Sequence, residues 1–417
     1  MGEIVRRADI LLPQTCELHR WSVVACDQFT SDPAYWAALD AEVGDAPSAL
    51  RLILPEAYLE GADLEAESRR IDAAMEEYLN AGLFRELPGS YVYLERTLRS
   101  GITRRGLLGA LDLEQYDYRA EATSPVRATE GTVESRLPAR MRIRAGAALE
   151  LPHVMVFLDD PADAVIGGCA GERDALEPLY DFSLLARGGQ ARGWRVSGAA
   201  ADRVDAALAE LTRRAEASAR LENRAPLVFA MGDGNHSLAT AKRCWEELKP
   251  TLTPEQRERH PARWSLVELV NIHDPSITFE PIHRVVWSGN PAAFLDELRA
   301  HFADAAEGAP RTLRAVTPEG ETLLSVPAPS IGALIGETDA VLSAHLARWG
   351  GKLDYVHNDE SALELARSGC CALLLPRLEK SELFPSVARS GPFPRKSFSI
   401  GRAEDKRYYL EARRIRP

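Results

Sequence analysis

The sequence lacks the features that mark secreted, membrane-spanning or zinc-stabilised proteins. Its six cysteines form no C-x-x-C pair and have no zinc spacing with the histidines, so neither a disulfide framework nor a structural zinc is expected. No stretch approaches the roughly 18 apolar residues that a membrane span needs. The first residues contain no sustained apolar signal segment. We therefore expect a cytoplasmic protein without a membrane partner.

Positive charge is also scarce. The 417 residues include 50 Lys and Arg against 62 Asp and Glu, which gives a net charge of −12. Because binding to a nucleic-acid backbone needs a basic surface, we expect no nucleic-acid partner. The remaining composition, with 45% hydrophobic and 27% charged residues, is that of a globular protein. At roughly 150 residues per domain, the length suggests two or three domains.

Hydrophobic patterns predict helices and strands in mixed order. Glycine turns predict hairpins at residues 91–113 and 180–197. The C-terminal third predicts a strand, a helix and a second strand over residues 352–375, and such a crossover implies parallel pairing. We expect an α/β fold with mixed sheets. The best internal boundary lies after Ser288, which gives an N-terminal and central region, 1–288, and a C-terminal region, 289–417.

The most informative segment is an apolar strand at 226–231, a glycine-rich turn and a helix that reaches residue 248. Gly232 and Gly234 permit positive φ and close approach of another group to the backbone. The start of a helix offers unpaired N–H groups and the positive end of a dipole, which favour a phosphate or carboxylate. We therefore predict an anion site at residues 232–237, with Asn235 and Ser237 among its binding residues.

Other side chains of this segment suggest chemistry. Asp233 could organise Mg²⁺ or accept a proton from a substrate hydroxyl. His236 has the right pKa range for proton transfer, and Lys242 stands one turn further on, where it could reach a phosphate. The alternative is an ordinary turn in which Asn235 or Ser237 only caps the helix.

The residues from Asp233 to Ala241, DGNHSLATA, resemble the D-G-x-H-R-x-x-A loop of the ParB/sulfiredoxin superfamily. The resemblance implies a ParB/sulfiredoxin-like core and a loop that binds nucleotide phosphates. Some members of that superfamily are small-molecule kinases, including free-serine kinases. Ser237 stands where the superfamily has arginine, which removes a bidentate phosphate anchor.

A longer resemblance covers nearly the whole chain. It is similar to an uncharacterised bacterial family, domain of unknown function 1015, which brings no established activity. The matching motifs follow in the family's order: VACDQFTS at 24–31, RATEGT at 127–132, GDGNH at 232–236, VNIHD at 270–274, IHRV at 282–285, PRKSFSIG at 394–401 and KRYYLE at 406–411.

These motifs supply further candidate residues. Asp27 and Gln28 follow an apolar run and could enter a site. Arg127 could clamp an anionic substrate and Glu130 could act as a base, although both could equally belong to a solvated face. Lys396 is a candidate phosphate binder.

His283 and Arg284 are adjacent in a predicted strand. Alternation puts them on opposite faces, so only one of them can face a given pocket. A histidine in this position is as readily a hydrogen-bonded core residue as a ligand.

Together these features favour a phosphoryl-transfer or phosphate-ester enzyme that acts on a small metabolite. Analogy with the superfamily's kinases implies ATP or ADP with Mg²⁺, and serine or phosphoserine as the substrate. The alternative is a non-catalytic nucleotide- or effector-binding regulatory module. An enzyme needs Asp27, Glu130 or His283 near the loop, whereas a sensor needs only the loop and a mobile element. The sequence does not give the oligomeric state.

Overall fold

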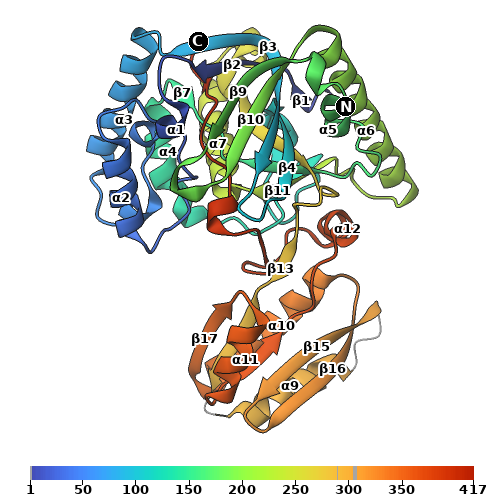
Figure 1. Cartoon of the computed structure of the whole chain (residues 1–417). Coiled ribbons are helices and arrows are strands. Elements are labelled where there is room, and N and C mark those ends of the chain that lie inside the picture. Colours follow the sequence, from blue (N-terminus) through green and yellow to red (C-terminus); the bar gives the residue numbers. More distant parts are fainter. Residues whose placement is uncertain (1, 289, 304–307) are drawn as a thin grey trace. The chain divides into compact units, whose positions relative to one another are not determined.

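The computed structural model describes residues 2–288, 290–303 and 308–417. It has a mixed α/β fold, as the sequence predicts (Figure 1). The chain forms two compact units. The first comprises Met1–Ala128, Thr132–Ile277 and Arg402–Pro417, and the second comprises Thr129–Gly131 and Thr278–Gly401.

An eleven-stranded mixed sheet forms the centre of the first unit. Its order is β5-β6-β11-β8-β12-β4-β3-β10-β9, with β1 paired to β4 and β2 paired to β3. Pairing is parallel between β5 and β6, β6 and β11, and β8 and β12, and antiparallel elsewhere. The strands are β1 (Val5–Arg6), β2 (Ala8–Pro13), β3 (Phe84–Thr97), β4 (Thr103–Asp112), β5 (Tyr116–Asp117), β6 (Val126–Arg127), β8 (Met155–Leu158), β9 (Glu177–Ser183), β10 (Gln190–Val196), β11 (Phe229–Asp233) and β12 (Trp264–Asn271).

Both predicted hairpins are present, as β3–β4 and β9–β10. A separate short pair joins β7 (Leu149–Glu150) to β20 (Arg413–Arg414) near the C-terminus. Both faces of the sheet are buried. Successive side chains of β3 show this, since they pack into different apolar clusters. Val92 packs into one apolar cluster and Tyr93 into the other.

Helices cover the two faces, and α2 and α3 lie on the opposite side from α5 and α6 (Figure 1). The helix α7 packs into the same cluster as α6 through Leu238 and Trp245. Asp32 caps α2 by accepting the N–H of Tyr35, with proline at the first helical position as predicted. The helices are α1 (Leu18–Trp21), α2 (Pro33–Val43), α3 (Leu64–Asn80), α4 (Leu137–Gly146), α5 (Ile166–Gly171), α6 (Gly198–Leu221), α7 (Asn235–Leu248) and α8 (Pro254–Arg259).

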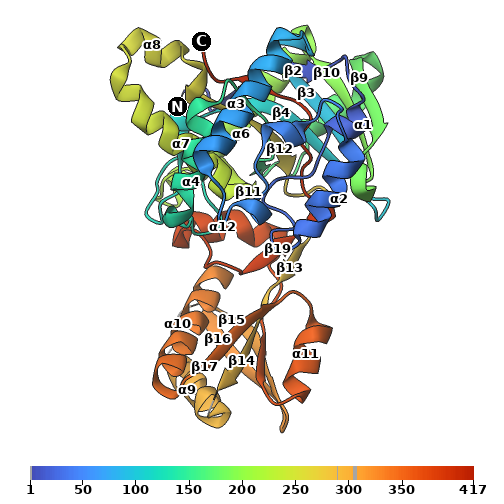
Figure 2. The ribbon, with the colours of Figure 1, turned by 90° about the vertical axis from the view of Figure 1, so that its left-hand side faces the viewer.

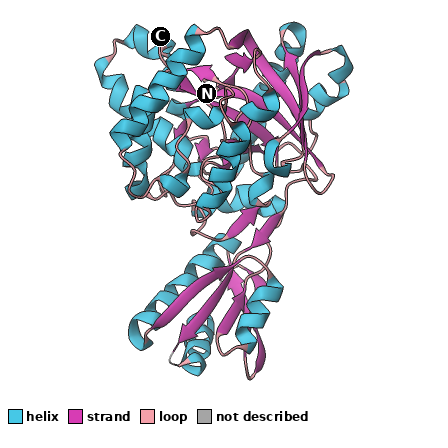
Figure 3. Ribbon diagram, turned by 60° about the vertical axis from the view of Figure 1, so that its left-hand side comes forward, coloured by secondary structure: helices cyan, strands magenta, loops and turns pink. Residues whose placement is uncertain are grey.

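The second unit contains a five-stranded sheet of order β16-β15-β18-β14-β17. Helices α10 and α11 flank its strands (Figure 2), and Figure 3 shows the same elements by type. A two-stranded pair, β13 (Phe279–Pro281) with β19 (Phe398–Ile400), completes the unit. The other elements are β14 (His283–Ser288), β15 (Ala309–Thr317), β16 (Gly320–Ala328), β17 (Gly351–Val356), β18 (Cys371–Leu374), α9 (Pro291–Ala303), α10 (Ile331–Trp349), α11 (Asp359–Arg367) and α12 (Lys380–Ser390).

Two expectations from the sequence need revision. The strands of the predicted crossover, β17 and β18, run parallel but do not pair, because β14 lies between them and is antiparallel to both. Since β14 is built into this sheet, the division after Ser288 differs from the observed one, which falls between Ile277 and Thr278 and returns Arg402–Pro417 to the first unit.

Among the described residues, the helices are too short or too polar to cross a bilayer.

Candidate functional site

The glycine-rich turn lies where β11 ends and α7 begins. Strand β11 is longer than predicted and includes Gly232 and Asp233, with a register shift against β8 at this point. Gly232 does not have a positive φ, contrary to expectation. The position needs glycine because a Cβ there would lie 3.0 Å from the ring of Phe157. Gly234 has a φ of +77°, and its Cβ would lie 3.1 Å from the Cα of Val154. The turn therefore requires both glycines, for different reasons.

The first N–H groups of α7 are only partly used by the chain itself. Gly234 donates its N–H to Asp233 Oδ1 at 2.9 Å, and Ser237 and Leu238 donate theirs to the carbonyl of Gly234. The N–H of residue 235 precedes the first intrahelical bond. Within the described parts of the chain, no side chain caps α7, so the capping role considered for Asn235 and Ser237 is not observed. The Oδ1 atom of Asn235 is buried with no hydrogen-bond partner among the described residues.

A lysine supplies positive charge beside this turn. The Nζ of Lys406 lies 3.1 Å from Oδ2 of Asp233, and both side chains are mostly buried. Burial alone would raise the pKa of Asp233, but the Lys406 ammonium and the N–H of Gly234 outweigh it and lower the pKa below the usual aspartate value. Asp233 is therefore a carboxylate at neutral pH and fixes the lysine at the start of α7.

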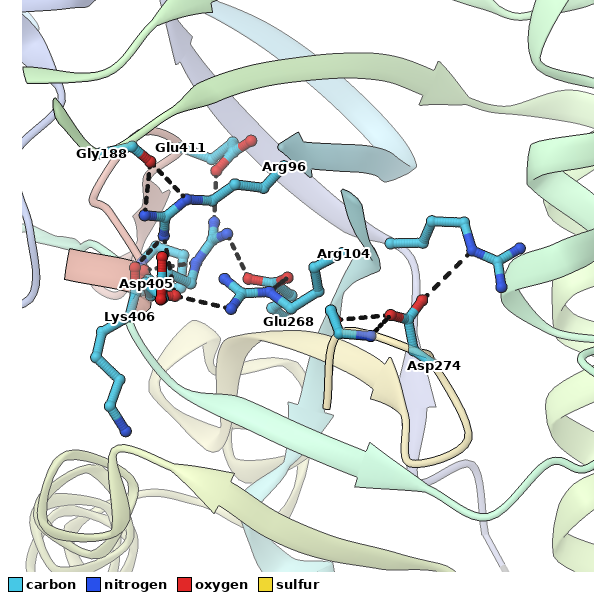
Figure 4. A network of polar contacts seen from close by, with 12 residues as sticks. Arg96, Arg104, Gly188, Glu268, Asp274, Asp405, Lys406 and Glu411 are labelled. Atoms are coloured by element: carbon cyan, nitrogen blue, oxygen red, sulfur yellow. Dashed lines mark hydrogen bonds and ion pairs between the residues drawn. The ribbon is translucent and has the colours of Figure 1, made fainter. Parts of the chain in front are cut away.

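A buried ionic network fixes the segment that carries Lys406 (Figure 4). Arg407 donates to Glu268 at 2.7 Å and to Glu411 at 2.7 Å. Arg104 donates to the carbonyl of Asp405 at 2.8 Å, and Arg96 donates to the carbonyl of Lys406 itself. In Figure 4 the side chain of Lys406 points away from this network, so the network holds the backbone while the ammonium remains at the turn.

On the other side of the turn, Ser237 forms a hydrogen-bonded pair with His153. The hydroxyl of Ser237 lies 2.7 Å from Nε2 of His153, and Nδ1 of His153 lies 3.0 Å from the hydroxyl of Tyr409. Tyr409 also accepts the N–H of Cys26 at 3.1 Å. When the imidazole proton is on Nδ1, the lone pair of Nε2 accepts a hydrogen bond from the hydroxyl of Ser237. The arrangement links a nucleophilic oxygen to a base and the base to a phenol.

Asp27 lies close to the imidazole of His153. Its Oδ2 lies 3.9 Å from Nε2 of His153, while its Oδ1 accepts the side-chain amide of Gln28 at 2.9 Å. Asp27 arrives here because Val24 and Ala25 pair with the segment 407–408, near the end of the chain. Asp27 and Gln28, predicted from the sequence, therefore lie near Ser237.

A cavity of about 170 Å³ opens beside Ser237 and His153. Its walls come from α3, α4, β7, α7, β12 and the segments 52–59 and 151–154, with Cys26 and Tyr409. Most of the lining is aliphatic, and among these side chains are Leu52, Ile53, Leu54, Leu59, Met75, Ile143, Leu149, Leu151 and Leu266.

Two predicted residues of the α7 segment have other partners. The Nε2 of His236 accepts the N–H of Val133 at 3.3 Å, whereas His153 is the histidine that lies beside Ser237. Lys242 donates to the carbonyl of Leu113 at 2.9 Å and pairs with Glu246 at 2.6 Å. Its ammonium is therefore committed along the side of α7 rather than at its start, and we remove it from the phosphate site.

Arg127 is a structural residue. It is 5% exposed, and its guanidinium donates to the carbonyls of Ser124, Ala225 and Pro226. Burial lowers its pKa. These bonds tie β6 to the chain that enters β11 and leave Arg127 committed to backbone oxygens instead of an anion.

The remaining candidates belong to the second unit. His283 accepts the N–H of Leu375 on Nδ1 at 3.2 Å and donates from Nε2 to Asp359 at 2.8 Å, which makes it a satisfied core histidine. Arg284 is fully buried, and its Nε and Nη2 donate hydrogen bonds to the two carboxylate oxygens of Asp339. The two side chains thus contact different helices, α11 and α10, as strand alternation predicts.

Glu130, Lys396 and Arg284 come together in this unit. Glu130 accepts the backbone N–H of Lys396 at 2.6 Å, and Arg284 donates to the carbonyl of Lys396 at 2.6 Å. Lys396 has a φ of +60°, which its backbone partners hold in place. Glu130 and Arg284 therefore fix a backbone turn, and the exposed side chain of Lys396 lies outside these contacts.

The donor set at Asp233 does not fit a Mg²⁺ ion held by the protein. Both carboxylate oxygens are engaged, one by Lys406 and one by the N–H of Gly234. In the part of the chain that the structure describes, no three His, Cys, Asp or Glu side chains are grouped as metal ligands. We therefore do not expect Asp233 to ligate Mg²⁺ directly.

Sequence reasoning missed Lys406, His153 and Tyr409. Lys406 and Tyr409 lie in the KRYYLE motif at 406–411, which was noted only as part of a resemblance. His153 stands at the start of the apolar segment 153–158, where a polar aromatic residue before a buried strand was the available signal.

A conserved hypothetical protein from Pyrococcus furiosus has 10% identity over 74% of this chain and 94% of its own, at a TM-score of 0.33. A free serine kinase in complex with AMP has 11% identity over 74% of this chain and 90% of its own, at a TM-score of 0.35. A variant of a free serine kinase in complex with ADP has 10% identity over 74% and 91%, at a TM-score of 0.36.

No curated protein matches the chain. A family model described as "Protein of unknown function (DUF1015)" matches residues 10–356. With more than four fifths of its length matched, the chain belongs to the DUF1015 family.

Proposed function

We propose that the turn at residues 232–237 binds the phosphate group of a small ligand, and that the protein is a phosphoryl-transfer or phosphate-ester enzyme. The observation that carries the proposal is the position of Lys406, whose ammonium lies beside an α7 N-terminus that no described side chain caps. The Asp233 carboxylate already pairs with this ammonium, so a bound phosphate would share Lys406 with Asp233 and take the rest of its neutralisation from the helix N-terminus.

The surrounding groups support chemistry as well as binding. Phosphoryl transfer needs positioning and charge neutralisation above all, and the turn with Lys406 would supply both. The Ser237–His153 pair, with Asp27 at 3.9 Å from the imidazole, would move a proton at the reacting oxygen. The position of Asp27 favours an enzyme over a regulatory module, which would need only the turn and a mobile element.

Nucleotides remain candidate ligands on the resemblance of the loop to the ParB/sulfiredoxin superfamily. The protein's own residues would contact their phosphates at the turn. We assign no protein ligand to Mg²⁺, so an ion that accompanies ATP or ADP would be held by the nucleotide's phosphates and water.

A thermal-shift panel tests the proposal, with inorganic phosphate, pyrophosphate, ATP, ADP and phosphoserine, each with and without Mg²⁺. A ligand at 100 times its Kd should stabilise the protein by about 2.7 kcal/mol. Lys406→Met, which we expect to weaken binding about 10- to 100-fold, should reduce this stabilisation to about 0.4–1.4 kcal/mol. Lys352→Met, which removes an exposed lysine of the second unit, should leave it unchanged.

Turnover separates the enzyme from the regulatory module. Phosphate release or transfer from a ligand that binds would support the enzyme, and His153→Gln should remove that activity while binding survives. Stabilisation without any turnover would support the regulatory module. No shift with any of the five compounds would contradict both.

A further inference from the structure

The cavity beside Ser237 is chemically different from the turn. Its lining is mainly aliphatic, and its charged residues are already paired. Arg140 is bonded to Glu56, and Arg144 donates to Glu150 at 2.6 Å. A polar or charged group that entered would lose its water without gaining a free partner of opposite charge. The cavity therefore favours an apolar occupant.

Its size indicates how large a buried group it can take. A dry cavity of about 150 Å³ lined by aliphatic and aromatic side chains holds a benzene molecule. The volume here is about 170 Å³. One aromatic ring, or an aliphatic group of similar bulk, would fill it.

Ser237 connects the cavity with the turn. It is the last residue of the turn, it belongs to the first helical residues of α7, and its side chain lines the cavity together with His153. The pair is hydrogen-bonded at 2.7 Å. A ligand with its phosphate on the turn and its carbon part in the cavity would place the linking ester oxygen beside this pair.

We propose that this site recognises phosphate esters of alcohols with an apolar group of about the size of a benzene ring. In the bound state Tyr409 would donate to Nδ1 of His153, the Nε2–H of His153 would donate to Ser237, and the Ser237 hydroxyl would donate to the ester oxygen. The proposal rests on the proposed function, because it takes the turn as the phosphate site. It replaces serine as the expected alcohol, since the paired charges of the cavity leave the ammonium and carboxylate of serine without partners.

Isothermal titration of the full chain tests the proposal with inorganic phosphate, methyl phosphate, benzyl phosphate and phosphoserine. Benzyl phosphate should bind at least about tenfold more tightly than methyl phosphate, because the ring removes apolar surface from water. Phosphoserine should bind no better than methyl phosphate.

Two variants on α4 form a matched pair. Ala139 lines the cavity and Ala145 does not. Ala139→Phe should fill the cavity and reduce benzyl phosphate to the affinity of methyl phosphate, while inorganic phosphate still binds and so reports a folded turn. Ala145→Phe should keep the preference. Ser237→Ala should weaken both esters more than inorganic phosphate.

The outcomes separate this inference from the proposed function. If inorganic phosphate binds but benzyl phosphate has no advantage over methyl phosphate in the natural sequence, the inference is wrong and the phosphate site stands. If Ala139→Phe keeps the preference, the ring lies elsewhere and the inference is also wrong. If none of the four compounds binds, both proposals fail.

Discussion

The ionic network behind Lys406 makes the stability of the first unit depend on Glu268. This carboxylate is fully buried; it accepts from Arg407 at 2.7 Å and lies 3.7 Å from Nε of Arg104. Burial alone would raise its pKa, but Arg407 and Arg104 outweigh burial and lower the pKa of Glu268. Glu268→Gln keeps the shape and removes the charge that both arginines need.

The magnitude follows from what remains after the change. Removing one partner of a buried ion pair costs about 3–5 kcal/mol, because a charge is left without compensation. Arg407 keeps its bond to Glu411, so we expect the lower end of that range. A loss of about 3 kcal/mol corresponds to roughly 100-fold faster exchange of core amides that open by global unfolding.

Hydrogen exchange of the β12 amides measures this loss directly within the first unit. Glu67→Gln serves as the control, because Glu67 and Arg70 form an exposed pair on α3 that is worth at most about 1 kcal/mol. If Glu268→Gln changes β12 exchange no more than Glu67→Gln does, the network is not what holds the segment around Lys406.

Three further predictions concern the turn and its neighbours. Gly234→Ala should destabilise the first unit by about 1–2 kcal/mol for the left-handed backbone alone, with more from the contact with Val154, as seen in exchange of β11 and β8. The pKa of Asp233 is lowered in the folded state, so its contribution to stability is present above the unfolded value of about 3.9 and is lost as the pH falls further. The difference in unfolding free energy between the natural sequence and Asp233→Asn should therefore shrink below about pH 4. A difference that stays constant over this range would contradict the assignment. Burial and Asp27 raise the pKa of the Cys26 thiol to about 12, so native Cys26 should react with iodoacetamide at pH 8 about a thousandfold more slowly than in the unfolded chain, as measured by mass spectrometry of its peptide.

Local patterns predicted the hairpin β3–β4 and the helix α7 that follows the turn. The hairpin β3–β4 follows from strand alternation around Ser100 and Gly101, and α7 follows from amphipathic spacing after the glycines of the turn. These features depend on residues close in sequence, where turn geometry and helix periodicity decide the outcome.

The partners of the turn could not be predicted in this way. Lys406 and Tyr409 come from the last residues of the chain, and His153 is 84 positions from Ser237. Lys242 lies about one helical turn from the predicted phosphate site, but its ammonium contacts the carbonyl of Leu113 and the carboxylate of Glu246. Which charged groups meet is decided by how the strands order in the sheet, and no local pattern encodes that order.

The domain division failed for the same reason. Strand β14 follows the first unit in the chain, yet its hydrogen bonds go to β17 and β18, which appear more than 60 residues later. The pairing of residues 129–131 with Phe393 and the return of the last residues to the first unit are also contacts between distant segments.

Titration of the amide-labelled chain with inorganic phosphate, followed by nuclear magnetic resonance, tests the central claim most directly. The amide signals of residues 234–237 should shift along one saturable curve, and Lys406→Met should move that curve to about 10- to 100-fold higher phosphate, the effect of losing one charge-assisted hydrogen bond. Shifts that saturate at other residues while these four stay unchanged would contradict an anion site at the start of α7.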